Sequence, residues 1–296
     1  MKLQGYGEDR LVAELTRALA TDENVRVGIG DDCAAIGSRS AKTWQLLKTD
    51  CIVEGVHFQQ DTAPEKIGWK AMARAISDIA AMGGLPRYAL VTLGVPAETE
   101  VARVKAIYAG IRKAARTFDF RVVGGETSRA PVLFLSVTLT GEVGRTRCAT
   151  RSGGRAGDLL FVTGRLGGSI RGRHLAFTPR LAEARWLAGN FRIRAMMDLS
   201  DGLGADLPRL ARASGTGYEI FEEKIPRNRG CTIREAIRDG EDYELLFAIA
   251  PSDAARLEKS WHKKFPRLAL TGIGVLAADR KSKIENRKSH GFDHFA

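Results

Sequence analysis

Apolar residues along this chain recur at two spacings, one typical of helices and one typical of strands. Leu11 and Leu15 repeat at helical spacing in one segment, and Ile67 and Ile79 belong to a similar stripe in another. The expected helices cover residues 8–20, 64–82, 100–118, 181–188, 205–213 and 252–261. The expected strands cover residues 25–29, 43–48, 89–95, 121–123, 132–142, 159–163, 196–199, 243–249 and 268–275. Because strands alternate with helices in both halves, the pattern predicts a mixed α/β (α+β) fold.

A glycine-rich connector interrupts this alternation near the middle of the chain. Gly153, Gly154 and Gly157 follow the last strand of the first half, and the strand–helix pattern then restarts. A length of 296 residues also fits two domains of ordinary size. We therefore expect an N-terminal α/β domain over residues 1–148 and a C-terminal α/β domain over residues 149–296.

The composition is typical of a globular protein, with 44% hydrophobic and 27% charged residues. No apolar run approaches the roughly 18 residues that a membrane span needs, so a membrane partner is not expected. The four cysteines have no paired spacing, which argues against a disulfide scaffold or a cysteine-based zinc site. We therefore expect the protein in a reducing cytoplasm.

The net charge of +11 suggests a polyanionic partner, but the distribution of charge does not support nucleic acid. Basic residues are dispersed along the chain, with the densest cluster at residues 280–288, and no nucleic-acid-binding motif is present. The motifs that could carry chemistry are acidic. An acidic site in a basic protein favours metal ions that bridge to the phosphates of a small anionic substrate.

Acidic residues recur directly after short apolar strands, beside glycine, serine or threonine. They are Asp31, Asp32, Asp50, Glu126, Asp198, Asp201, Glu241 and Asp242. Each one alone is compatible with turn chemistry, but strand ends that are distant in sequence can converge at one sheet edge. Carboxylates without a histidine or cysteine cluster favour a hard cation such as Mg²⁺ together with phosphate oxygens. The Walker A sequence, the protein-kinase motifs and a dinucleotide-binding glycine fingerprint are absent.

Asp78 is expected in the last turn of the second helix, where the helix dipole disfavours an anion by about 0.3–1 kcal/mol. Its apolar neighbours Ile76 and Ile79 would add a desolvation cost if the side chain were buried. The carboxylate therefore needs a compensating cation. Arg74, four residues earlier, and a metal ion are the two candidates.

Taken in order, several short motifs resemble those of one enzyme family. They are GIGDDCA at residues 28–34, TD at 49–50 followed by EGVHF at 54–58, SDIAAMG at 77–83, GGET at 124–127, TRSG at 150–153, DLSDGL at 198–203, GEDYEL at 240–245 and GFDHF at 291–295. The set resembles the thiamine-monophosphate kinase family, within the superfamily of aminoimidazole ribonucleotide synthetase and selenophosphate synthetase. The resemblance extends from about residue 7 to the end of the chain.

The resemblance implies a two-domain synthetase-like fold, in which the N-terminal α/β domain dimerises by pairing sheets. ATP and several Mg²⁺ ions would lie between that domain and the C-terminal α/β domain. The implied reaction transfers the γ-phosphoryl group of ATP to the phosphate of thiamine monophosphate, giving thiamine diphosphate and ADP. Because the accepting phosphate is already largely ionised, such a reaction needs metal ions to overcome repulsion rather than a strong base.

The resemblance also implies roles for individual residues. The expected magnesium ligands are Asp32, Thr49, Asp50, Asp78, Glu126, Asp198 and Asp201, and the expected catalytic residues among them are Asp50, Asp78 and Asp198. The expected nucleotide contacts are Gly125, Glu126, Arg151 and Ser200. The expected thiamine-phosphate contacts are His57, Glu241 and Phe292.

Two positions depart from the usual pattern of the family. Glu126 replaces an aspartate, and Lys48 stands two residues before Asp50, where relatives often have serine or threonine. Period-two alternation places Lys48 and Asp50 on one strand face, so Lys48 is either a fixed cation beside the carboxylates or an exposed strand-end lysine. The alternatives to the kinase are another ATP-dependent phosphotransferase of the superfamily, a catalytically weakened thiamine-phosphate- or nucleotide-binding protein, and a basic nucleic-acid-associated protein.

The chain ends in an aromatic segment that contains Phe292 and Phe295. Two phenylalanines are costly to leave in water, so burial of both is expected. Either both plug the C-terminal core, or Phe292 packs against the thiamine rings while Phe295 anchors the tail.

Overall fold

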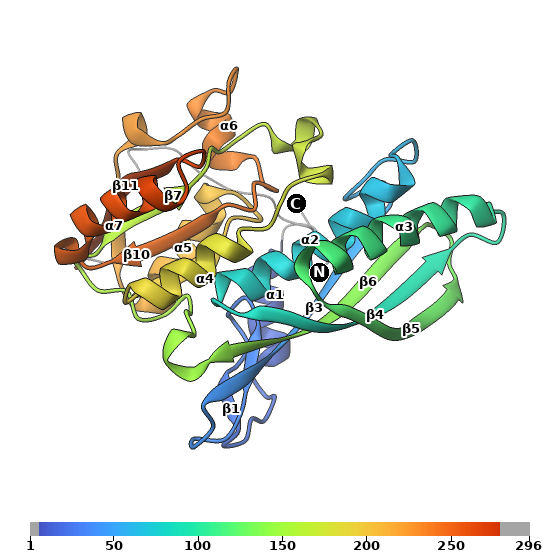
Figure 1. Cartoon of the computed structure of the whole chain (residues 1–296), viewed down its shortest axis with the longest axis horizontal. Helices are drawn as coiled ribbons and strands as arrows, with labels where there is room; N and C mark the ends of the chain where they lie inside the picture. Colours follow the sequence, from blue (N-terminus) through green and yellow to red (C-terminus); the bar gives the residue numbers. More distant parts are fainter. Residues whose placement is uncertain (1–5, 279–296) are drawn as a thin grey trace.

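The computed structural model describes residues 6–278, and separate halves of the sequence build its two sheets (Figure 1). The strands of the first half are β1 (Val25–Val27), β2 (Ala34–Ile36), β3 (Thr43–Val53), β4 (Leu85–Val95), β5 (Arg121–Arg129) and β6 (Phe134–Gly144). Its helices are α1 (Glu8–Thr16), α2 (Pro64–Ala81), α3 (Val101–Phe118) and the 3₁₀ turn η1 (Arg145–Arg147).

The second half has the same mixture of elements, so the predicted α/β class is confirmed. Its strands are β7 (Leu159–Thr163), β8 (Ala195–Asp198), β9 (Gly217–Ile220), β10 (Leu245–Ile249) and β11 (Leu270–Ala277). Its α-helices are α4 (Leu181–Asn190), α5 (Leu203–Ser214), α6 (Ile233–Arg238) and α7 (Pro251–Lys264). Its 3₁₀ turns are η2 (Ser169–Arg171), η3 (Arg173–Leu175) and η4 (Glu222–Lys224). The sequence pattern did not predict the short elements β2, β9 and α6.

The first sheet has the strand order β1-β2-β3-β6-β4-β5, and α2 and α3 cover one of its faces (Figure 1). The stripe that predicts α2 is buried against the sheet, with Ile67, Ile76 and Ile79 fully enclosed. The two helices approach closely because Gly68 and Gly110 lie at their contact. A Cβ on Gly68 would lie 1.9 Å from the carbonyl oxygen of Ile107. Within residues 6–278, no helix covers the opposite face along β4 and β5 (Figure 1).

Two strands run further than the sequence predicts. The expected strand 43–48 continues as β3 to Val53, paired residue by residue with β6, so Thr49 and Asp50 lie inside a strand. Likewise, β5 does not end at residue 123 but continues to Arg129 beside β4. The prediction is wrong at both places because the neighbouring strand satisfies the backbone hydrogen bonds, which overrides the turn preference of the local residues.

The second sheet has the order β8-β10-β7-β11-β9 and is covered on both faces. Alternate residues of β10 pack against α4 and α7 on one side and against α5 and α6 on the other. Every residue of β10 is buried, as is every residue of β8. A strand that is buried on both faces has a continuous apolar sequence, which explains why Met196 and Met197 precede the buried Asp198 without alternation.

Helix α1 is shorter and more exposed than its apolar stripe suggests. The helix ends at Thr16 rather than residue 20, and none of its residues is buried. Asp9 holds it against α5 by ion pairs with Arg209 and Arg212, at 3.0 and 2.9 Å. Its apolar residues Val12 and Leu15 are exposed in this arrangement.

The C-terminal turn of α2 joins the two halves. Ala80 and Ala81 belong to the hydrophobic core of the second half, where they pack with Leu187 of α4. The backbone N–H of Ala149 donates to the carbonyl oxygen of Met82 just beyond the helix. The end of α2 is therefore fixed where the two sheets meet. No α-helix within residues 6–278 is long and apolar enough to span a bilayer.

Candidate active site

Three buried aspartates from distant parts of the sequence meet at this junction. Asp32 immediately precedes the β2 region, Asp78 lies in the last turn of α2, and Asp198 ends β8. One carboxylate oxygen of each lies within 4.8 Å of the others, and all three side chains are buried. We call these residues the aspartate cluster. The structure thus brings together three of the expected magnesium ligands.

The aspartate cluster is electrostatically costly as it stands. Burial raises the pKa of Asp78 well above its usual range, and the Lys48 ammonium only partly opposes this rise. Burial and the Asp32 charge likewise raise the pKa of Asp198, against a 2.6 Å hydrogen bond that the Ser77 hydroxyl donates to Asp198 Oδ2. Like charges this close inside a protein favour a bound cation or a proton.

Lys48 supplies one positive charge to the aspartate cluster. Its Nζ lies 3.0 Å from Asp78 Oδ1, on the face of β3 that packs toward α2. Burial lowers the pKa of Lys48, but the Asp78 and Asp50 carboxylates outweigh burial and raise it, so the side chain is charged at neutral pH. The interpretation of Lys48 as a fixed cation is confirmed. Arg74 is not the partner of Asp78, because its NH2 group pairs with Asp50 Oδ1 at 3.2 Å.

Arg151 pairs with another member of the aspartate cluster. Its Nε donates to Asp32 Oδ1 at 3.1 Å, and its backbone N–H donates to the Asp31 carboxylate. The second oxygen, Asp32 Oδ2, is buried and has no hydrogen-bond partner among residues 6–278. A buried carboxylate oxygen without a partner carries the full cost of desolvation.

These observations fit a hard divalent cation in the aspartate cluster. The three residues offer only carboxylate oxygens, which are the ligands that Mg²⁺ prefers. A cation here would satisfy Asp32 Oδ2, and its charge would offset the burial and the mutual repulsion that raise the pKa of Asp78 and Asp198.

The segment after β8 places Ser200 and Asp201 beside the cluster. Arg209 of α5 pairs with Asp201, and Asp206 accepts a 3.0 Å hydrogen bond from the Asp201 backbone N–H. Asp201 is therefore held from two sides, and both Ser200 and Asp201 line the pocket described next.

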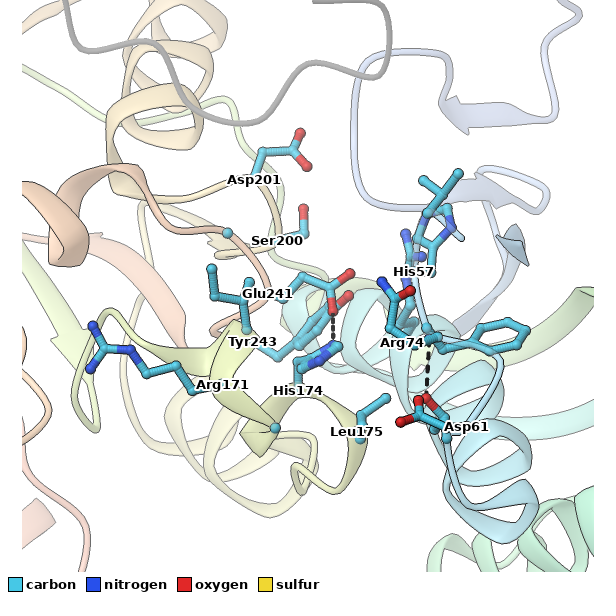
Figure 2. A pocket seen from close by; sticks show the side chains of 17 residues that line it. His57, Asp61, Arg74, Arg171, His174, Leu175, Ser200, Asp201, Glu241 and Tyr243 are labelled. Atoms are coloured by element: carbon cyan, nitrogen blue, oxygen red, sulfur yellow. Dashed lines mark hydrogen bonds and ion pairs between the residues drawn. The ribbon is translucent and has the colours of Figure 1, made fainter. Parts of the chain in front are cut away.

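A pocket of about 510 Å³ opens between the two halves (Figure 2). The N-terminal half contributes His57 and Arg74, whereas the C-terminal half contributes Ser200, Asp201 and Glu241. The two expected thiamine-phosphate contacts in the described part of the chain, His57 and Glu241, thus line one cavity. The third, Phe292, lies outside the described residues.

The loop that presents Glu241 has an unusual backbone. Glu241 has φ 64° and Tyr243 has φ 50°, in the left-handed region that non-glycine residues rarely occupy. Two backbone hydrogen bonds hold the loop, from the Glu241 N–H to Ser200 O and from the Tyr243 N–H to Leu199 O. The Tyr243 ring stacks on Phe177, with centroids 3.9 Å apart. Such a conformation persists only where the surroundings enforce it, and it is typical of ligand sites.

A buried lysine holds the Glu241 carboxylate in place. Lys70 of α2 is completely buried and pairs with Glu241, and its Nζ also donates to His57 O at 2.7 Å. His174 Nδ1 lies 2.8 Å from Glu241 Oε2, and Figure 2 shows this contact at the pocket wall. Lys70 therefore links the two expected substrate contacts to α2.

One face of α2 carries four polar residues that all point toward the site. Lys70, Arg74 and Asp78 occupy successive turns, and Ser77 adjoins Asp78. Lys70 pairs with Glu241, and Arg74 pairs with Asp50. Asp78 pairs with Lys48, and Ser77 donates to Asp198. This polar face of α2 connects the pocket to the aspartate cluster.

Three expected site residues do not reach the aspartate cluster within one chain: Thr49, Gly125 and Glu126. Asp50 on β3 lies opposite Val137 on β6, which lies opposite Val91 on β4. Val91 in turn lies opposite Gly125 on β5, so Gly125 is three strands away from Asp50. Adjacent strands are about 4.8 Å apart, so the separation is about 14 Å. Thr49 and Glu126 lie on the open face of the sheet, opposite the helices, because side chains alternate along each strand. Glu126 Oε1 accepts the Thr127 backbone N–H.

The sequence alone did not reveal Lys70, His174 or the role of Arg74 in the pocket. Their partners lie far away in the sequence; for example, Lys70 and Glu241 are 171 residues apart. One local signal was available for two of them. Lys70, Arg74 and Asp78 recur every four residues on a largely apolar helix, which indicates a charged face that contacts other polar groups.

Comparisons with known proteins agree with the sequence motifs. The chain matches the family model for the AIR synthase related protein, N-terminal domain, over residues 30–143. It matches the model for the AIR synthase related protein, C-terminal domain, over residues 132–285. The chain is 38% identical to thiamine-monophosphate kinase of Rhodopirellula baltica, over 91% of this chain and 92% of that protein. It is 34% identical to the enzyme of Aquifex aeolicus over the full length of both.

Solved structures with a similar fold come from the same group of proteins. AaThiL complexed with AMPPCP and TMP superposes with a TM-score of 0.85 at 32% identity, over 100% of this chain and 99% of that one. The hydrogenase maturation protein HypE of E. coli shares the fold alone, with a TM-score of 0.67 and 19% identity over 84% of this chain and 85% of that one. On the strength of its motifs, its fold and its full-length relatives, the chain belongs to the thiamine-monophosphate kinase family of the AIR synthase-related superfamily.

Proposed function

We propose that this chain transfers the γ-phosphoryl group of ATP directly to thiamine monophosphate, yielding ADP and thiamine diphosphate. The observation that carries the proposal is the polar face of α2, which connects a 510 Å³ pocket with the aspartate cluster. A cationic substrate with a phosphate tail would place its rings near Glu241 and its phosphate toward the aspartate cluster. The relative bound to AMPPCP and TMP supports the same pair of substrates.

The reaction joins two anions, so the site must neutralise charge rather than remove a proton. Mg²⁺, when held by Asp32, Asp78 and Asp198, would neutralise phosphate charge and align the donor and acceptor oxygens. The described residues bind and orient the two substrates around that position. The proposed roles are thiamine-phosphate binding for His57 and Glu241, nucleotide binding for Arg151 and Ser200, and further metal contacts for Asp50 and Asp201.

Arg151 and a metal ion share Asp32 in this proposal. Its guanidinium pairs with Asp32 Oδ1, which leaves the unpartnered Oδ2 for a metal ion. The guanidinium has further N–H donors, and with Asp32 also holding a divalent ion these donors would pair with the phosphates of the nucleotide. Nucleotide and metal would therefore bind together more tightly than either one alone.

Removal of divalent ions should stop the reaction. We expect ADP and thiamine diphosphate in a 1:1 ratio with Mg²⁺ present, no thiamine diphosphate in EDTA, and full recovery when Mg²⁺ is restored. The measurement is chromatographic separation of both products. ATP hydrolysis without thiamine diphosphate would contradict the proposed acceptor, and product formation in EDTA would contradict the role of the metal.

Lys48 should reduce the amount of Mg²⁺ that the aspartate cluster needs. Its ammonium already occupies one side of Asp78, so Lys48→Ser should increase both the Mg²⁺ concentration at half-maximal rate and the steepness of that dependence. Mn²⁺ binding, measured by electron paramagnetic resonance, should show an additional ion in the variant. Lys42, which is exposed at the start of the strand region, provides the control Lys42→Ser. Identical titrations for Lys48→Ser and the wild type would show that the ammonium does not replace an ion.

We also propose that the chain forms a homodimer through the open face of the first sheet. That face exposes Tyr88 and Leu90 of β4, at 55% and 47% of their surfaces, and every residue of the edge strand β5 is exposed. A second copy that pairs its sheet here would cover these apolar side chains. Thr49 and Glu126 share this face, so their proposed metal role depends on the dimer. Sedimentation equilibrium tests the association.

The proposed location is a reducing cytoplasm. All four cysteines are free thiols, and Cys51 is exposed on β3. Exposed thiols persist where glutathione and thioredoxin keep them reduced.

A further inference from the structure

Arg74 lies where the pocket meets the carboxylates. Its side chain lines the pocket together with His57 and Glu241, and it pairs with Asp50. The side chain is 13% exposed, so it is largely shielded from solvent but still open to the cavity. A guanidinium in this position faces any ligand that reaches from the pocket toward the aspartate cluster.

The hydrogen-bonding capacity of Arg74 is mostly unused. A guanidinium has five N–H donors. NH2 contacts Asp50 Oδ1 at 3.2 Å, and NH1 donates to the carbonyl oxygen of Cys51, also at 3.2 Å. Nε is buried and has no hydrogen-bond partner in the described part of the chain. Both contacts are long for charge-assisted hydrogen bonds, which usually measure about 2.7–2.9 Å. The guanidinium is therefore suited to donate shorter hydrogen bonds to a second anion.

The polar face of α2 sets the order of the groups around that position. Lys70, Arg74 and Asp78 are four residues apart, so each lies about 6 Å further along the helix axis than the one before. Lys70 marks the Glu241 end of the pocket, and Asp78 marks the aspartate cluster. A ligand whose cationic part contacts Glu241 and whose tail points to the cluster would bring its tail to Arg74.

Other basic groups in the pocket are less suited to this role. Arg171 is engaged with Glu235, its side chain is 56% exposed, and in Figure 2 it extends away from Arg74. Lys70 is fully buried behind Glu241. His174 is occupied by Glu241 and Lys70. Among the basic residues named here, Arg74 combines access to the pocket with proximity to the carboxylates.

We infer that Arg74 binds the phosphate of thiamine monophosphate and so selects a phosphorylated acceptor over the free vitamin. This inference rests on the proposed function, because it names a residue that receives the acceptor. One edge of the guanidinium stays on Asp50, and the remaining N–H groups hold the phosphate, as the planar geometry of arginine permits. Arg74 thereby positions the accepting oxygen toward the nucleotide and offsets part of the repulsion between the two phosphates.

The test compares the binding of thiamine monophosphate and thiamine, which differ only in the phosphate. Isothermal titration in EDTA excludes any contribution from divalent ions. The wild type should prefer thiamine monophosphate. Arg74→Met should lower the affinity for thiamine monophosphate by about 10- to 100-fold, since hydrogen bonds to charged groups contribute about 1.5–3 kcal/mol. Its affinity for thiamine, and its affinity for AMPPCP with Mg²⁺, should stay the same.

Two further variants keep the test decisive. Arg74→Lys keeps the charge without the planar fork, so it should recover part of the preference for the phosphate even if Arg74→Met folds poorly. Arg116→Met removes an exposed arginine from α3 and should bind both ligands like the wild type. Unchanged preference in Arg74→Met, or equal loss of both ligands, would overturn the inference. A wild-type protein that binds thiamine monophosphate but forms no thiamine diphosphate would instead contradict the proposed function.

Discussion

Asp198→Asn should reduce turnover at least 1,000-fold and leave the fold intact. Asp198 is buried in the aspartate cluster, and its hydrogen bond comes from the Ser77 hydroxyl, which an amide oxygen also accepts. The substitution removes one anionic ligand, and it also removes a carboxyl whose pKa is raised by burial and by the Asp32 charge. We therefore expect the melting temperature to stay the same or rise. A loss of this size is expected if the metal positions both phosphates, because misalignment at a transfer site costs orders of magnitude in rate.

Asp158→Asn provides the matched control. Asp158 is also buried, but it stabilises a turn by accepting the backbone N–H of Arg155. The next residue, Leu159, pairs with Ile249, whereas Asp198 pairs with Leu245 at the opposite end of β10. The turnover of Asp158→Asn should match that of the wild type. Turnover of Asp198→Asn within tenfold of the wild type at limiting Mg²⁺ would show that Asp198 is not a ligand of a catalytic metal ion.

Lys70→Met should raise the Michaelis constant for thiamine monophosphate about 30-fold or more, because truncation of one partner in a buried charge pair costs about 2–5 kcal/mol. Met has a similar length and suits this fully buried position. Without the ammonium, the Glu241 carboxylate keeps the His174 hydrogen bond and the attraction of the Arg74 charge, but it loses its direct ion pair and its fixed orientation. The Michaelis constant for ATP should change less than threefold. Lys66→Met, an exposed lysine on the same helix, is the control.

Deprotonation of Lys70 should weaken the binding of thiamine monophosphate at alkaline pH. Burial lowers the pKa of Lys70 to about 8, although the Glu241 charge opposes this. Burial raises the pKa of Glu241, but the His174 hydrogen bond and the Lys70 charge outweigh burial and lower it to about 2. The pair is therefore charged between these values and loses its positive member above pH 8. Wild-type affinity for thiamine monophosphate should fall from pH 7 to 9. The same fall in Lys70→Met would assign the titration to another group.

Local sequence features predicted those elements whose boundaries are set by local chemistry. Helix α2 was expected over residues 64–82 and spans Pro64–Ala81, because a proline begins it and Gly83 follows it. The strands at Asp50 and Glu126 were predicted too short, because their continuation depends on pairing with β6 and β4. Pairing between distant segments leaves no local pattern in the sequence.

The candidate site likewise has features that the sequence predicted and features that depend on the fold. Strand-end carboxylates and the unfavourable position of Asp78 indicated an acidic centre, and the structure places Asp32, Asp78 and Asp198 together. The sequence could not show that Thr49 and Glu126 lie on the other face of the sheet, because that depends on strand register. Nor could it show which cations neutralise the carboxylates, because Lys48 reaches Asp78 only when β3 packs on α2.

In the complex with both substrates, a divalent ion held by the aspartate cluster should lie between the nucleotide and the accepting phosphate. A crystal structure with Mn²⁺, AMPPCP and thiamine monophosphate, measured at the manganese absorption edge, tests it most directly. We expect an anomalous peak within coordination distance of Asp32, Asp78 and Asp198, with the thiamine rings beside Glu241. Manganese bound only elsewhere, with no ion at the aspartate cluster and none between the phosphates, would contradict this position of the ion.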